Sequence, residues 1–195
     1  MIKSKFTKRV LLLTSVAVLG AGGVAVADDD DHRGGFFSKF IGSKSIKRGV
    51  APVDNPQYRE ECGACHFAYQ PGLLPARSWR RVMAGLEEHF GENAELPKED
   101  ARVLKDYLVK NAAEHSNYKR SVKIMRTLSS NDAPLRTTDT PYITRKHRGL
   151  SPRQVVDNPE VVSISNCDAC HTQAVRGSFS ERGIDIPGFG RWEDD

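Results

Sequence analysis

The sequence predicts a mainly α-helical protein with extensive loops and little β structure. Two segments between residues 78 and 113 carry apolar residues spaced by three and four, the pattern of a helix with one buried face. The first covers residues 78–90, where Ser78 is a good N-cap and Gly91 a good terminator. The second covers residues 97–113 and begins with a proline followed by acidic residues. After Asn117 the periodicity weakens and prolines and glycines interrupt the chain, so we expect a loop-rich region in which residues 122–128 could form a strand or a short helix.

The start of the chain predicts export from the cytoplasm. Basic residues precede an apolar stretch over residues 10–18, and Ala25, Val26 and Ala27 form an A-x-A cleavage site. We expect residues 1–27 to be a signal peptide, cleaved after about Ala27, with an uncleaved membrane anchor as the alternative. The apolar stretch is shorter than the roughly 20 residues that span a bilayer, which favours cleavage. We expect no transmembrane segment in the mature chain.

Cleavage would remove the net charge of the chain. The 29 basic and 25 acidic residues give a formal net charge of +4 at pH 7. Four of the basic residues and none of the acidic ones lie in the expected signal peptide, so 25 of each remain in the mature chain. A neutral protein gives no general reason to expect nucleic-acid binding.

Two five-residue motifs contain all four cysteines of the chain. Residues 62–66 and residues 167–171 both read C-x-x-C-H, the attachment signature of a c-type haem. The thiols of such a motif bind the haem covalently, and the histidine is the proximal iron ligand. Zinc sites and disulfides also use C-x-x-C pairs, but they leave both histidines unexplained. The sequence therefore predicts two covalently attached c-type haems, with thioether bonds to Cys62, Cys65, Cys167 and Cys170 and proximal ligands His66 and His171.

Each iron then needs a sixth ligand or keeps an open position. His89 is the strongest candidate for the first iron, because it lies on the apolar face of its predicted helix, 23 residues after His66. A core histidine bonded to a carbonyl is the alternative there. His147 lies 24 residues before His171 in a basic turn, and it either enters the second haem pocket or is exposed with its neighbours. The other candidates, which we expect to be solvated or packing residues, are His32, His115, Met83 and Met125, with His115 next in order.

The two motifs divide the mature chain into two small haem-centred halves. We expect a flexible basic lead-in over residues 28–50 and a first haem domain with two helices over residues 51–120. Residues 121–195 are expected to form a second, loop-rich haem domain. Hydrophobic residues make up only 38% of the chain, so two buried haems would supply apolar surface that the sequence lacks.

With these motifs the chain resembles the dihaem cytochrome c family of exported bacterial electron carriers. The resemblance runs from about Tyr58 to Phe189, and residues 74–91 are its most diagnostic part beyond the haem motifs. It implies two bis-histidine, low-spin haems and a role in electron transfer. Some members of the family pass electrons to a second haem protein that binds oxygen.

We therefore expect a periplasmic one-electron carrier that exchanges electrons with redox partner proteins, another haem protein being one candidate. The alternative is a dihaem enzyme, a peroxidase or small reductase, in which one iron keeps an open or labile position. The chain has enough spare histidines to close both sites, which favours the carrier. A docking subunit of a membrane complex is a third hypothesis, in which the basic lead-in contacts an acidic partner.

Overall fold

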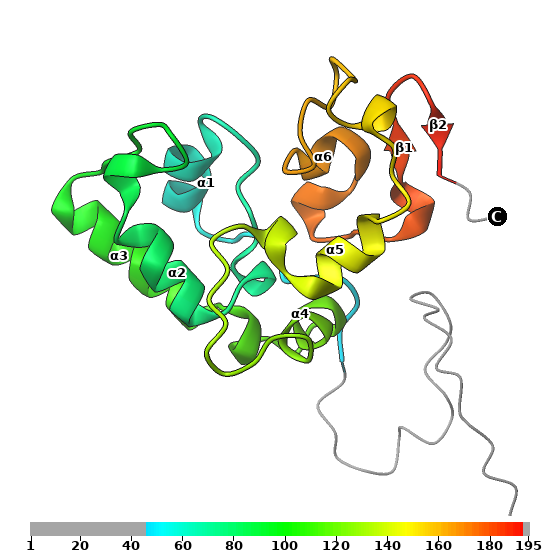
Figure 1. The fold of residues 1–195 in the computed structure, drawn as a ribbon. Helices are drawn as coiled ribbons and strands as arrows, with labels where there is room; N and C mark the ends of the chain where they lie inside the picture. Colours follow the sequence, from blue (N-terminus) through cyan, green and yellow to red (C-terminus); the bar gives the residue numbers. More distant parts are fainter. Residues whose placement is uncertain (1–45, 193–195) are drawn as a thin grey trace, which may run out of the picture. The chain divides into compact units, whose positions relative to one another are not determined.

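The structure, a computed structural model, describes residues 46–192 and is mainly α-helical (Figure 1). Within these residues there are six α-helices, joined by loops and single 3-10 turns, and one sheet of two short strands. The prediction of a mainly α protein with extensive loops and little β structure is confirmed. The expected signal peptide, nearly all of the lead-in and His32 lie outside the described residues.

The helices are α1 Pro56–Gly63, α2 Ala76–Met83, α3 Lys98–Lys110, α4 Lys119–Met125, α5 Pro141–His147 and α6 Cys167–Cys170. The strands are β1 Asp185–Ile186 and β2 Gly190–Arg191, which pair antiparallel with Ile186 opposite Gly190. No helix within residues 46–192 is both long enough and apolar enough to span a bilayer.

A first hydrophobic core lies between α1, α2 and α3. Tyr58 from α1, Trp79 from α2 and Leu104 and Leu108 from α3 are its largest buried side chains. Trp79 is buried without leaving its indole unpaired, because its Nε1 donates to the carbonyl of Pro71 over 2.8 Å. Leu104 and Leu108 are four positions apart, so they lie on one face of α3, and this face is buried as the sequence pattern predicts.

The helix expected over residues 78–90 is shorter and begins earlier. Helix α2 runs from Ala76 to Met83, and the chain leaves the helical conformation at Gly85. Glycine is a poor helix former, so the apolar spacing does not carry the helix through this position. A single 3-10 turn follows, and the His89 amide then donates to the Glu92 carbonyl over 2.7 Å. His89 therefore lies in a turn after the helix and not on its apolar face.

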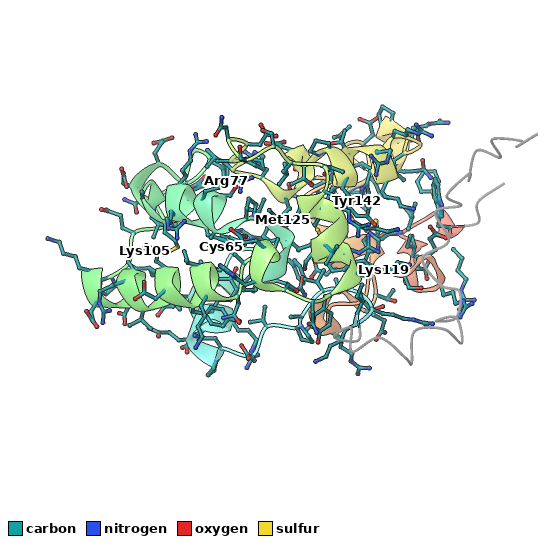
Figure 2. The ribbon with its side chains drawn as sticks, turned by 90° about the horizontal axis from the view of Figure 1, so that it is seen from below. Cys65, Arg77, Lys105, Lys119, Met125 and Tyr142 are labelled. Atoms are coloured by element: carbon teal, nitrogen blue, oxygen red, sulfur yellow. The ribbon has the colours of Figure 1, made fainter. Side chains whose placement is uncertain are left out.

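A second core gathers α4, α5 and the segment after the second motif. Ile124, Tyr142 and Phe179 are buried in it, and Tyr142 is drawn with the neighbouring side chains in Figure 2. The start of the described chain closes this core, since the Val50 amide donates to the Gly177 carbonyl over 2.9 Å. Gly177 has φ +75° and approaches Val50 so closely that no larger residue fits. Both cores belong to one compact unit.

Candidate haem sites

The first C-x-x-C-H motif begins in the last turn of α1. Asn55 caps this helix by accepting a 2.9 Å hydrogen bond from the Tyr58 amide, and Gly63 ends it. Cys62 therefore points partly into the first core, whereas Cys65 and His66 are exposed on the turn that follows. Burial raises the pKa of the Cys62 thiol to about 11.

The second motif is itself a single helical turn, α6, with His171 immediately after it. The backbone of His171 and Thr172 pairs with the residues before β1, because the Thr172 amide donates to the Gly183 carbonyl over 2.9 Å. Both cysteines of this motif are half-buried. Burial, with a contribution from Asp168, raises the pKa of Cys167 to about 12. All four cysteines have free thiols, as haem attachment requires.

The structure brings the four histidines expected as iron ligands into two pairs. The ring centres of His66 and His89 are 6.2 Å apart, with the ring planes 18° from parallel. The ring centres of His147 and His171 are 6.0 Å apart, with the planes at 77°. Metal–imidazole bonds of about 2 Å on opposite sides of one metal would place ring centres about 6 Å apart. The spacing of both pairs therefore fits one iron between each pair of rings.

Hydrogen bonds set the tautomer of two of these rings. Nδ1 of His66 lies 2.8 Å from the Phe67 carbonyl, and Nδ1 of His147 lies 2.8 Å from the Ile143 carbonyl. A carbonyl only accepts, so both Nδ1 atoms carry a proton and the Nε2 lone pair is left for a metal. Nδ1 of His171 is buried and has no hydrogen-bond partner among residues 46–192.

The surroundings of three of these histidines favour the neutral imidazole. Burial is the largest cause that lowers the pKa of His171 to about 4, followed by His147 and the Arg120 cation. Burial also lowers the pKa of His147, and Arg120 adds to the effect. The pKa of His89 is lowered by burial, then by His66 and Arg136. A histidine binds a metal in its neutral form, so these shifts favour iron ligation near neutral pH.

His147 lies in the basic turn expected from the sequence, but its ring does not share the exposure of its neighbours. Arg145 and Arg148 are exposed, whereas His147 is half-buried beside His171. The last turn of α5 therefore presents the histidine inward and its arginines outward.

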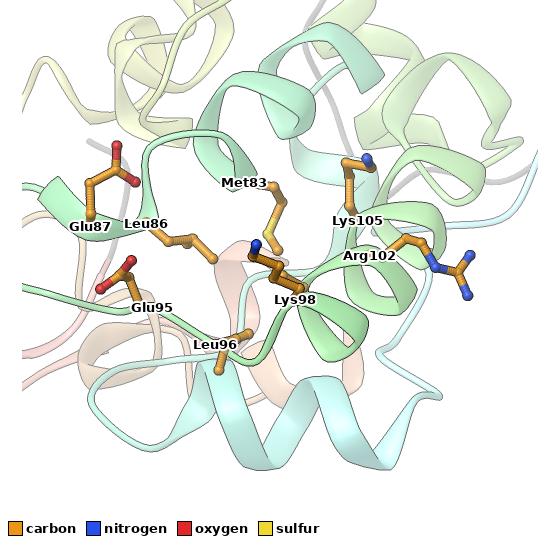
Figure 3. A pocket seen from close by; sticks show the side chains of 9 residues that line it. Met83, Leu86, Glu87, Glu95, Leu96, Lys98, Arg102 and Lys105 are labelled. Carbon is orange, nitrogen blue, oxygen red and sulfur yellow. The ribbon is translucent and has the colours of Figure 1, made fainter.

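His115 and Met83, two other candidate ligands within residues 46–192, lie outside the two pairs. His115 is exposed at the end of a 3-10 turn, Ala113–His115. Met83 packs on the first core and lines a cavity of about 270 Å³, shown in Figure 3. Lys98, Arg102 and other charged side chains line this cavity too, and none of the four paired histidines does.

Two residues of these sites escaped sequence reasoning. The guanidinium carbon of Arg120 is 5.7 Å from the ring centre of Tyr142 and 5.5 Å from that of Phe179, and its Nη2 donates to the Phe179 carbonyl over 2.9 Å. Tyr69 lies beside His66 with their ring centres 5.5 Å apart. Neither residue belongs to a motif, and only the tertiary contacts bring them to the histidine pairs.

Comparison with known proteins agrees with this geometry. A model of the family "Dihaem cytochrome c" matches residues 58–179. The solved structure of a diheme cytochrome c from Shewanella baltica OS155 is 40% identical, with a TM-score of 0.60, over 71% of this chain and 98% of that one. A diheme cytochrome c from Rhodobacter sphaeroides is 45% identical, with a TM-score of 0.60, over 67% of this chain and 100% of that one. The comparison with curated proteins gave no match.

Proposed function

The chain belongs to the dihaem cytochrome c family, and from this premise we propose that it is an exported one-electron carrier with two bis-histidine, low-spin haems. Membership of the family implies two covalently attached c-type haems. In the proposal the first haem is bound through Cys62 and Cys65, and the second through Cys167 and Cys170. The axial ligands are His66 and His89 for the first iron, and His171 and His147 for the second.

The observation that carries the proposal is the equal spacing of the two histidine pairs. Ring centres 6.2 and 6.0 Å apart leave room for one iron and no further ligand in either pair. An iron with an imidazole on each face has no open position for a substrate or for oxygen, so the haem can only accept and release an electron. Two imidazoles also give a lower reduction potential than one imidazole and one methionine sulfur.

The protein's own residues prepare these sites for ligation. The carbonyls of Phe67 and Ile143 hold His66 and His147 in the tautomer that leaves Nε2 free. The lowered pKa values of His89, His147 and His171 keep their rings unprotonated. Cys62 is half-buried against the first core, so a thioether bond at this position would hold the haem edge next to apolar side chains.

The proposal is tested by spectroscopy of the exported holoprotein and of single-histidine variants. The oxidised protein is expected to be fully low-spin and unable to bind carbon monoxide when reduced. His89→Ala or His147→Ala should each make one of the two irons high-spin and reactive with carbon monoxide. His115→Ala is the matched control, because His115 is exposed and outside both pairs, and it should change neither haem.

Two results would contradict this assignment. If His89→Ala and His147→Ala leave both irons six-coordinate while His115→Ala opens one, the distal ligands are wrong. A high-spin iron in the wild-type protein would instead favour a dihaem peroxidase or reductase with a labile site.

Export and partner choice belong to the same proposal. Residues 1–27 have the organisation of a signal peptide, so the mature periplasmic protein is expected to begin near Asp28. N-terminal sequencing of the haem-loaded protein checks this directly. Its partners are expected to be other redox proteins, with a second haem protein as one candidate.

A further inference from the structure

We infer that Tyr69 links the two haem sites and forms part of the route by which an electron passes between them. The inference rests on the proposed function, because it takes both histidine pairs as iron ligands. It concerns a residue that neither holds a haem nor belongs to either C-x-x-C-H motif.

The ring of Tyr69 lies against the first site. Its centre is 5.5 Å from that of the His66 imidazole, at an interplanar angle of 51°. The backbone is fixed at the same point, because the buried Tyr58 hydroxyl donates to the Tyr69 carbonyl over 2.7 Å. Tyr69 packs on both hydrophobic cores, so its position depends on both halves of the described chain.

The hydroxyl of Tyr69 reaches the second site. It donates a 2.5 Å hydrogen bond to the Ser165 carbonyl, 96 positions along the chain. The same carbonyl accepts a hydrogen bond from the Cys167 amide over 3.0 Å. Cys167 is the first thioether cysteine of the second motif. A chain of one ring contact and two hydrogen bonds therefore joins His66 to the residue that would hold the second haem.

A second contact holds the same two segments together. Gln70 is fully buried, and its Nε2 donates to the Ala174 carbonyl over 2.6 Å. Tyr69 and Gln70 thus bind the segment after the first motif to residues on either side of the second motif. These two hydrogen bonds tie together the chain segments that flank the expected haem ligands.

The transfer needs no proton and no further reactant. One electron leaves the first iron, which goes from ferrous to ferric, and the second iron goes from ferric to ferrous. Burial raises the pKa of Tyr69 to about 12, so its hydroxyl stays protonated and continues to donate to Ser165 at neutral pH. Tyr69 itself is neither oxidised nor deprotonated in this step.

The test measures electron exchange between the haems of the half-reduced holoprotein, from the broadening of haem methyl signals in NMR spectra. Tyr69→Phe keeps the ring and removes the hydroxyl, and it should slow the exchange several-fold. Tyr69→Leu also removes the ring and should slow it further. Tyr107→Phe is the matched control, because the Tyr107 ring contacts that of Tyr58 in the first core, 5.5 Å away at 46°, and Tyr107 is not itself one of the groups in the route. It should leave the exchange rate unchanged.

If Tyr69 only supports the fold, the pattern of electron-exchange rates is different. The two reduction potentials are measured for each variant, so that rates are compared at the same driving force. An unchanged rate in Tyr69→Phe overturns the inference, as does a slowing that the altered driving force fully explains or that Tyr107→Phe reproduces. If Tyr69→Leu does not fold, Tyr69→Phe decides alone. Failure of the proposed function would be seen separately, as a missing haem or a high-spin iron in the wild-type protein.

Discussion

Replacing Arg120 by glutamine is expected to lower the reduction potential of the second haem and to leave the first unchanged. The ring of Phe179 lies 5.5 Å from the Arg120 guanidinium carbon and 5.3 Å from the His171 ring. The cation is thus held close to the expected proximal ligand. A positive charge at this place opposes the oxidised iron more than the reduced iron, so it raises the potential.

The size of the effect follows from Coulomb's law. For a charge taken to lie about 10 Å from the iron, the contribution is about 1.7 kcal/mol at an effective dielectric constant of about 20. For a one-electron couple, about 59 mV corresponds to a tenfold change in equilibrium constant, so the full effect is roughly 70 mV. Arg120 is half-buried, and solvent and salt screen part of its charge. We therefore expect a shift of about 30–70 mV, smaller at high salt.

A spectroelectrochemical titration of the holoprotein measures both potentials. Arg120→Lys is the first control, because it keeps the charge and should leave the potential near the wild-type value. Arg102→Gln is the second, because Arg102 is exposed on α3 and paired with Glu99 over 2.6 Å. The reasoning is refuted if neither potential falls in Arg120→Gln, or if Arg120→Lys lowers it equally, since packing rather than charge would then be the cause.

Three further predictions concern stability. Gly177→Ala should lower the free energy of unfolding by at least about 2 kcal/mol, measured with denaturant. The reason is that φ is +75° and the new Cβ would lie 2.1 Å from the Val50 carbonyl oxygen. An unchanged unfolding midpoint would show that this contact is relaxed. Leu104→Ala, at a fully buried position of the first core, should cost about 2–5 kcal/mol in the same assay, with haem content as the check on loading. Burial raises the pKa of Tyr69 and of Tyr107 to about 12, above the ordinary value of 10. The unfolded chain therefore loses these protons first, and the midpoint should fall as the pH rises from about 10 to 12; a flat profile would show that both hydroxyls ionise as freely as in water.

The chemistry of the haem sites could be predicted from the sequence because it depends on neighbouring residues. Each C-x-x-C-H motif holds two thiols and the expected proximal histidine within five positions, so local order alone predicts two haem attachment sites. The same holds for α3, where the apolar spacing and the initial proline and acidic residues all lie within one segment. Its observed bounds, Lys98–Lys110, fall inside the predicted range.

The surroundings of the sites could not be predicted in this way. The apolar spacing predicts His89 on a helical face, yet the helix ends at Met83 and His89 lies in a later turn with its ring 6.2 Å from that of His66. The predicted helix at His89 is therefore wrong, and its role as an iron ligand stays a prediction. Arg120 reaches Phe179 across 59 positions, and Tyr69 reaches Ser165 across 96. Such contacts depend on how the two cores pack, which a single sequence does not reveal.

The two sites resemble one another in sequence but differ in the environment they offer an iron. His66 and Cys65 are exposed, whereas His171 and both cysteines of the second motif are half-buried. A haem bound at the more exposed first motif would keep more contact with solvent, which stabilises the extra charge of an oxidised iron. A cation lies near a histidine of each pair, Arg136 near His89 and Arg120 near His171, so charge raises both potentials and does not by itself separate the two sites. The difference in exposure would then set the driving force, and an electron that enters at the first site would move toward the more buried second site.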